Sequence, residues 1–177
     1  SDKALYGTGN ANITAEGLFF SDGDIGFAFT GETDVNITNS TFQNFSGAGI
    51  KNIFIEPIGR LPEPEDEEIY LSNSLITNNN YGLILERNSY GNINNNAIYG
   101  NSAAAWTNSD EEEPTLNFEN NWWGSPTGPY HYFYNTSGEG DILETADEDF
   151  DPWLLANPFG ATEVEIGSLG QFKYDGV

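Results

Sequence analysis

Carboxylate side chains are the groups in this sequence best able to carry out chemistry. They gather in two stretches, SDGDIG at positions 21–26 and ETADEDFD at positions 144–151. Calcium favours acidic turns, whereas two carboxylates placed across a sugar linkage can hydrolyse it. DGDIG begins as an acidic calcium loop does, but no distal glutamate stands at the expected spacing. Calcium is therefore the candidate cofactor, and a solvated acidic surface without an ion is the alternative. The candidate ligands are Asp22, Asp24, Asp147, Asp149 and Asp151.

Other catalytic residue types are scarce. One histidine, His131, supports neither a zinc site nor a Ser-His-Asp triad, and without Cys or Met there are no disulfides or soft metal sites. A polysaccharide lyase needs a cation or base beside an anionic sugar, but the five basic residues are scattered among acids. They are Lys3, Lys51, Arg60, Arg87 and Lys173. We predict no catalytic residue and no enzyme, with a glycoside hydrolase as the main enzymatic alternative.

A cluster of aromatic residues could bind sugars by stacking. The stretch PYHYFYN, at positions 129–135, holds four rings around His131, and strand alternation would expose some of them. Packing of these rings inside the fold is the alternative interpretation. The four rings are Tyr130, Tyr132, Phe133 and Tyr134.

The charge balance narrows the class of partner. Five Lys and Arg face 28 Asp and Glu, which gives a formal net charge of −23. Nucleic acids, anionic membranes and anionic polysaccharides should be repelled. No apolar run of about 18 residues is present, so we expect no membrane insertion. Cations are the natural counterparts, and adaptation to salt would account for the same acidity.

An internal repeat determines the predicted fold. Five segments align on apolar anchors about 24, 34, 22 and 25 residues apart, a spacing typical of a solenoid. The anchors are Ile13, Ile37, Leu71, Ile93 and Phe118. A second apolar position recurs five residues later, at Leu18, Phe42, Ile76, Ile98 and Trp123. The alternating pattern favours short strands, and abundant Asn and Gly disfavour helices.

Asparagine recurs two positions after four of the anchors. Asn tolerates the left-handed backbone of a tight turn, and identical Asn side chains on successive repeats can hydrogen-bond in a ladder. We therefore predict an asparagine ladder, with exposed turn residues as the alternative. Its members are Asn39, Asn73, Asn95 and Asn120.

At positions 10–124 these repeats resemble the right-handed parallel β-helix, or pectin-lyase-like, family of exported and surface proteins. The stretches NNWWGSPTGP, GEGD and DPWLLANPF are similar to the segments that close such solenoids. The resemblance implies an all-β solenoid of about five rungs at positions 1–124. It also implies an irregular cap at positions 125–160, to which Trp122, Trp123 and Trp153 contribute.

Three segments are expected to lie outside the rungs. GRLPEPEDEE, within an insertion at positions 56–68, and SDEEEP, at positions 109–114, should be solvated loops. The tail at positions 161–177 regains strand alternation and could pair with another subunit. Its alternating residues are Val164, Ile166, Phe172 and Tyr174. Positions 1–10 supply no helix to cover the first rung, so we expect either that the chain is part of a longer solenoid or that the edge is used in assembly. Solvation of a short, Gly-rich edge is the alternative.

Glycosylation sequons suggest an extracellular or cell-surface location. Asn-X-Ser/Thr occurs at five positions, of which Asn39 should be a poor acceptor if it lies in the ladder. The remaining candidates are Asn12, Asn36, Asn44 and Asn135, and Asn12 and Asn36 should point outward. The sequence therefore predicts a structural protein of a sheath, surface layer, filament or adhesin that assembles with itself. A carbohydrate-binding module is the second hypothesis.

Overall fold

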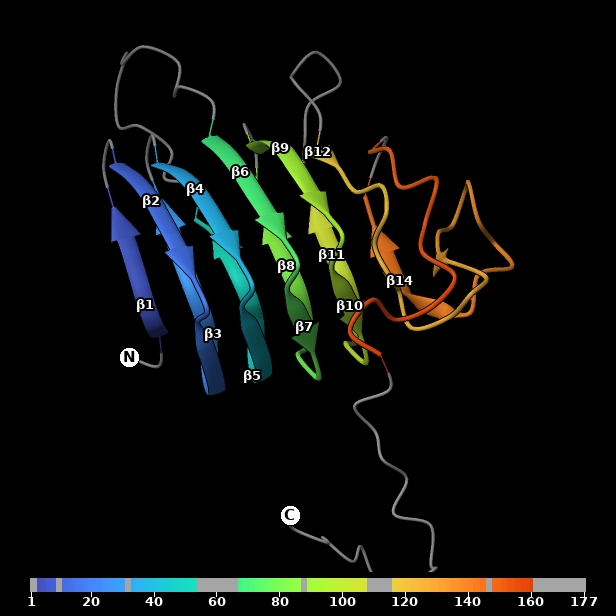
Figure 1. The fold of residues 1–177 in the computed structure, drawn as a ribbon, viewed down its shortest axis with the longest axis horizontal. Coiled ribbons are helices and arrows are strands. Elements are labelled where there is room, and N and C mark those ends of the chain that lie inside the picture. Colours follow the sequence, from blue (N-terminus) through green and yellow to red (C-terminus); the bar gives the residue numbers. More distant parts are fainter. Residues whose placement is uncertain are drawn as a thin grey trace, which may run out of the picture.

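The computed structural model describes residues 3–8, 11–30, 33–53, 67–86, 89–107, 116–145 and 148–160 (Figure 1). Within these ranges the chain is all-β, as predicted, and contains no helix. The strands are β1 (Lys3–Thr8), β2 (Ala11–Glu16), β3 (Phe19–Thr30), β4 (Thr33–Thr38), β5 (Thr41–Asn52), β6 (Glu67–Ser72), β7 (Leu75–Thr77), β8 (Tyr81–Leu85), β9 (Ser89–Asn94), β10 (Ala97–Tyr99), β11 (Ala103–Thr107), β12 (Leu116–Asn117), β13 (Pro129–Tyr130) and β14 (Gly140–Glu144).

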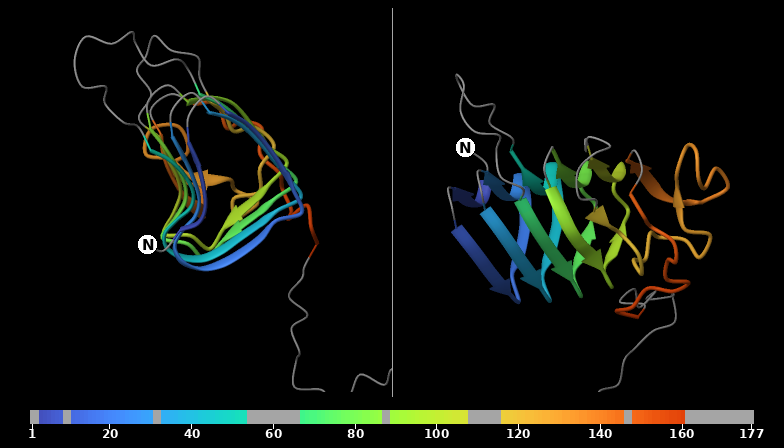
Figure 2. Two further views of the ribbon diagram at one scale, coloured as in Figure 1. Left: turned by 90° about the vertical axis from the view of Figure 1, so that its left-hand side faces the viewer. Right: turned by 90° about the horizontal axis from the view of Figure 1, so that it is seen from above.

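The strands form parallel sheets. One sheet has the order β1-β3-β5-β8-β11-β14-β13, with β7 pairing with β5 and β10 as a side branch. The other has the order β12-β9-β6-β4-β2. Strand order follows chain order in both sheets except at β13, which pairs on the far side of β14, so the chain passes back and forth between the sheets as it advances. Figure 2 shows the strands of each sheet one behind another around a common interior.

The core consists of apolar side chains stacked in register between the sheets. Phe42 pairs with Ile76, which pairs with Ile98, and on the other sheet Ile37 pairs with Leu71. All five side chains are fully buried. Burying each one stabilises the fold by about 1.5–3 kcal/mol, so the columns of like residues hold the sheets together.

The first repeat is shifted by two residues from the predicted alignment. Ala15, rather than Ile13, pairs with Ile37, and Phe20, rather than Leu18, pairs with Phe42. The turn between them is made by Gly17, which has a φ of 67°. Glycine adopts that conformation without steric cost, so this repeat needs no asparagine at its turn. The predicted alignment was wrong here because Ile13 is larger and more apolar than Ala15, the residue that in fact pairs with Ile37.

The predicted asparagine ladder is also displaced, by one residue. Asn39, Asn73, Asn95 and Asn120 adopt φ values of 51°, 51°, 58° and 58°, so they make the tight turns that the sequence indicated. Their side chains are exposed or half-buried, and the Asn39 amide donates instead to Glu16. A left-handed residue at a corner turns its side chain outward, so it cannot stack within the core.

The ladder runs through the residue that follows each of these turns. The Ser40 backbone N–H donates to Ser74 Oγ at 3.0 Å, and the Ser74 N–H donates to Asn96 Oδ1 at 3.0 Å. The Asn96 N–H and side-chain amide both donate to Asn121 Oδ1, at 2.9 and 3.1 Å. All four residues are buried. Side chains thus satisfy backbone groups that the turns leave unpaired inside the fold.

A second ladder follows the next corner of each repeat. Asn79 Oδ1 accepts from the Phe45 N–H at 3.0 Å, and Asn101 Oδ1 accepts from both the Asn79 N–H and its side-chain amide at 3.0 Å. Asp141 ends this series by accepting from the N–H groups of Gly100 and Asn101. Burial raises the pKa of Asp141, and these hydrogen bonds partly oppose the rise.

Two segments predicted to be irregular contain strand residues. Glu67 and Glu68, assigned to the insertion loop, belong to strand β6. Strand β14, within the predicted irregular cap, continues the larger sheet by pairing with β11. The SDEEEP loop and the predicted assembly tail, Val164, Ile166, Phe172 and Tyr174, lie outside the described residues.

Candidate functional site

A hollow of about 440 Å³ opens on the C-terminal part of the described chain. It lies between the turn that follows β13 and the segment that follows β14. Three aromatic and three acidic residues line it: Tyr134, Glu148, Asp149, Phe150, Asp151 and Trp153. Aromatic walls with a few polar groups are typical of a small-molecule or sugar site.

His131 holds the turn that carries the aromatic rings. Its Nδ1 accepts from the backbone N–H groups of Phe133 and Tyr134, at 3.2 and 3.1 Å. Because Nδ1 is the acceptor, the ring hydrogen lies on Nε2, which donates to the Thr145 carbonyl at 3.2 Å. Asn135 closes the turn by exchanging backbone hydrogen bonds with His131. The single histidine is thus a buried structural residue.

The rings on this turn face solvent. Tyr132, Phe133 and Tyr134 are 70%, 74% and 64% exposed. Tyr134 is stacked on the His131 ring with centroids 5.0 Å apart, which fixes its orientation. The sequence prediction that some of these rings lie outside is confirmed for three of them, whereas Tyr130 is half-buried in β13. Large exposed apolar groups gathered in one place mark an interaction surface.

The floor of the hollow is firmly positioned. Phe150 and Trp153 are stacked with centroids 6.3 Å apart, and the Trp153 indole N–H donates to the Pro126 carbonyl at 3.1 Å. Trp153 also packs against Gly128, where an added Cβ would lie 2.5 Å from a ring atom. This segment is tied to the sheets because the Phe118 N–H donates to the Asp149 carbonyl at 2.7 Å. The site is therefore preformed.

The three tryptophans predicted to cap the fold differ in their surroundings. Trp123 is fully buried and packs against Phe118 with ring centroids 6.2 Å apart. Trp122 is half-buried and bridges to Ala97 in the parallel sense, while Trp153 packs against the core from the hollow. Trp123 thus belongs to the core itself, and Trp153 forms the boundary between core and site.

The candidate calcium ligands are not brought together. Asp22 and Asp24 lie in β3, whereas Asp149 and Asp151 lie beside the hollow, where Asp149 Oδ1 accepts from the Asp151 N–H at 3.2 Å. Asp147 falls outside the described residues. Among those that are described, no group of three or more His, Cys, Asp or Glu side chains could hold a metal ion.

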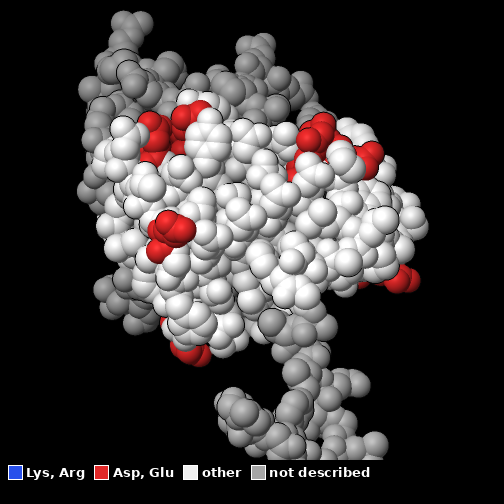
Figure 3. All heavy atoms as spheres, viewed as in Figure 1, with Lys and Arg blue, Asp and Glu red and all other residues white. Residues whose placement is uncertain are grey.

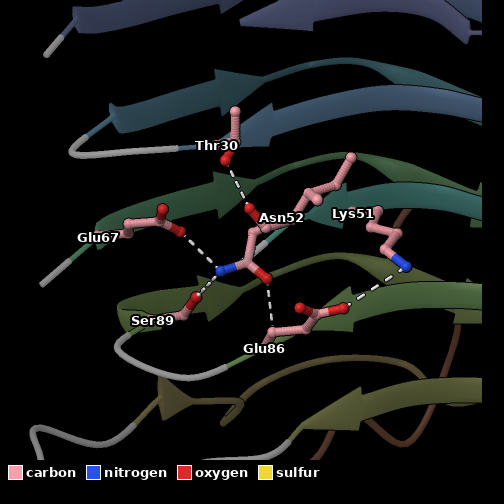
Figure 4. Close-up of polar contacts among 7 residues, drawn as sticks. Thr30, Lys51, Asn52, Glu67, Glu86 and Ser89 are labelled. Carbon is pink, nitrogen blue, oxygen red and sulfur yellow. Dashed lines mark hydrogen bonds and ion pairs between the residues drawn. The ribbon is translucent and has the colours of Figure 1, made fainter. Parts of the chain in front are cut away.

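A buried polar cluster, absent from the sequence prediction, joins the two sheets (Figure 4). Asn52, at the end of β5, donates to the carboxylate of Glu67 at 2.6 Å and to Ser89 Oγ at 2.7 Å. Its Oδ1 accepts from the Glu86 N–H at 2.5 Å, and Lys51 forms an ion pair with Glu86 at 3.6 Å. Burial raises the pKa of Glu67 to about 7, although the hydrogen bond from Asn52 opposes the rise.

The sequons differ in accessibility. Asn12 and Asn36 are exposed on β2 and β4, as predicted, and Asn44 is exposed on β5. The Asn135 side-chain amide instead donates to the carbonyls of Thr127 and Pro129, at 2.9 and 2.8 Å. Its nitrogen is therefore engaged in holding the aromatic turn, which makes Asn135 a poor acceptor for a glycan.

Comparisons with protein-family models, curated proteins and solved structures give no match. No helix able to cross a membrane is found in the described ranges. The functional argument therefore depends on the hollow and the exposed rings beside it.

Proposed function

We propose that this chain is an extracellular, non-enzymatic protein that binds carbohydrate at the hollow beside Trp153. The observation that carries the proposal is the grouping of exposed rings with a preformed aromatic hollow. Sugars present flat C–H faces that stack on such rings, while carboxylates accept hydrogen bonds from sugar hydroxyls. The exposed sequons Asn12, Asn36 and Asn44 agree with an extracellular setting.

The scaffold in this proposal is a right-handed parallel β-helix of about five rungs. Strand order that follows chain order in two parallel sheets, except at β13, supports it, as do the side-chain ladders at successive corners. The pectin-lyase-like resemblance agrees with the same architecture. Such a scaffold offers rigid positions for a binding surface at its end.

Removing a ring tests the carbohydrate site. Tyr134→Ala should weaken binding of a glycan found on an array by about fivefold or more, because one stacked ring contributes about 1 kcal/mol or more. Calorimetric titration measures the change. The matched control is Tyr70→Ala, which removes an exposed ring from β6 on the other sheet. Equal losses in both variants, or none in Tyr134→Ala, would contradict the proposed site.

Self-association through the N-terminal edge is the second candidate, and one observation favours it. The register of β1 with β3 begins at Lys3 and Ile25, so positions 19–24 of β3 have no described strand on that side. Leu5, Tyr6 and Phe19 are 39%, 45% and 65% exposed at this edge. A strand edge with exposed apolar side chains and no described neighbour invites pairing, here with a second copy of the chain.

Light scattering with and without millimolar calcium tests the association. The chain should form larger particles as its concentration rises, and Phe19→Ser should shift this onset to at least about threefold higher concentration by removing apolar contact area. Tyr132→Ser, which removes an exposed ring at the other end, is the control. A monomer under all conditions would exclude assembly and leave the carbohydrate proposal unaffected.

A further inference from the structure

We propose that the hollow selects glycans that carry protonated amino groups, such as oligomers of glucosamine. The inference rests on the proposed carbohydrate function and specifies the class of sugar. It follows from the combination of rings and carboxylates in one lining, and from the charge of the molecule around it.

The rings of the hollow suit a cation as well as a sugar face. A protonated amine is attracted to the face of an aromatic ring, most strongly to that of Trp. Tyr134 and Trp153 offer the accessible ring surface in this space, whereas Phe150 is only 6% exposed and supports Trp153 by stacking on it. An amino sugar would place its C–H face and its ammonium group on a single aromatic surface.

Carboxylates supply the opposite charge. Asp149 and Asp151 are exposed beside the rings, and the 3.2 Å hydrogen bond from the Asp151 N–H orients the Asp149 side chain. Hydrogen bonds between an ammonium group and a carboxylate are about twice as strong as those between neutral groups. A glycan with free amines therefore gains more from this lining than a neutral one does.

Among the described residues, neither lysine nor arginine lines the hollow. Of the side chains that the structure describes, Lys51 is the one basic group other than His131, and it is paired with Glu86 in the cluster of Figure 4. On the face shown in Figure 3 the described residues carry separate acidic patches and no basic one. With a net charge of −23, the chain attracts cationic polymers and repels uronic-acid or sulfated ones.

Calorimetry with three oligosaccharides of equal length tests the inference. At pH near 6 and low salt, the glucosamine oligomer should bind at least about tenfold more tightly than the N-acetylglucosamine and glucose oligomers. The double variant Asp149→Asn with Asp151→Asn should reduce this preference to less than about threefold. Asparagine retains the Oδ1 acceptor of Asp149, so the turn should keep its geometry.

The matched control removes two exposed carboxylates far from the hollow. Glu16→Gln with Asp34→Asn, on β2 and β4, makes the same change in net charge and should leave the preference within about twofold. An equal loss in both double variants would show general charge attraction and overturn the inference. Equal affinity for free and acetylated oligomers would overturn it while leaving the carbohydrate function intact. No binding of any of the three sugars would overturn both.

Discussion

Replacing Asn96 by alanine should reduce the free energy of unfolding by about 4 kcal/mol. The Asn96 side chain accepts from the Ser74 N–H at 3.0 Å and donates to the Leu71 carbonyl and Asn121 Oδ1, at 2.9 and 3.1 Å. Alanine would leave the buried Ser74 N–H and Leu71 carbonyl without this partner and would also open a small cavity, whereas Asn121 Oδ1 would still accept from the backbone N–H of residue 96. Urea denaturation followed by circular dichroism measures the change.

The matched control is the preceding residue. Asn95 is exposed and has a φ of 58°, a conformation that glycine adopts freely. Asn95→Gly should therefore change the stability by less than about 1 kcal/mol. If both variants lost the same stability, or if Asn95→Gly lost more, the ladder would not run through Asn96.

Glu67→Gln should change the free energy of unfolding more favourably at pH 8 than at pH 4, and the difference between the two changes should be about 2–3 kcal/mol. The pKa of Glu67 rises in the folded state from the ordinary value of 4.5 to about 7, because burial disfavours the charged carboxylate. The folded state thus binds the proton more tightly than the unfolded state. The protonated Glu67 side chain therefore stabilises the folded state fully below pH 4.5, and this stabilisation is lost as the pH rises through 7.

Glutamine keeps an oxygen that accepts the 2.6 Å hydrogen bond from Asn52 but carries no charge, so this pH-dependent loss should disappear. Because the chain carries a net charge of −23, the effect of removing one negative charge must be measured separately. Glu139→Gln, at an exposed position, is that control. The test is to measure the urea unfolding midpoints of the wild type and of both variants between pH 4 and pH 8. Parallel pH profiles for the wild type and Glu67→Gln would contradict the assignment.

Sequence periodicity predicted the all-β fold and most of the core because apolar residues recur where they are buried. Ile37, Leu71 and Ile93 pair in register as the repeat indicated. The first repeat was misaligned because Ile13 and Ala15 both face inward and composition alone favours the larger one. Only the position of the turn at Gly17 distinguishes the two alignments.

The side-chain ladder was misplaced for a related reason. Asn39 and Asn73 recur more regularly than the residues that follow them, which are Ser40 and Ser74 in two repeats and Asn in the others. Serine and asparagine can both accept from a backbone N–H, so the ladder preserves a hydrogen-bonding role rather than a residue type. The recurrence of the same residue, asparagine, therefore identified the turns. The position of the buried ladder could be found only from the conformation of the backbone.

The candidate site was predictable in part. The aromatic turn was evident from PYHYFYN, but its partners Phe150 and Trp153 are separated from it along the sequence and meet it only in the fold. Glu67 lies in a run of acidic residues, and nothing in the sequence indicated that one of them would be buried rather than exposed. Its burial depends on the meeting of β5, β6 and β9, which no local pattern records.

The central claim, that glycans bind in the aromatic hollow, is tested most directly by the tryptophan indole N–H signals in a ¹⁵N–¹H spectrum. The Trp153 signal, assigned by its loss in Trp153→Phe, should shift saturably as a glucosamine oligomer is added. The Trp123 signal should stay in place, because that ring is fully buried in the core. A Trp153 signal that does not move with any oligosaccharide tested would contradict the account.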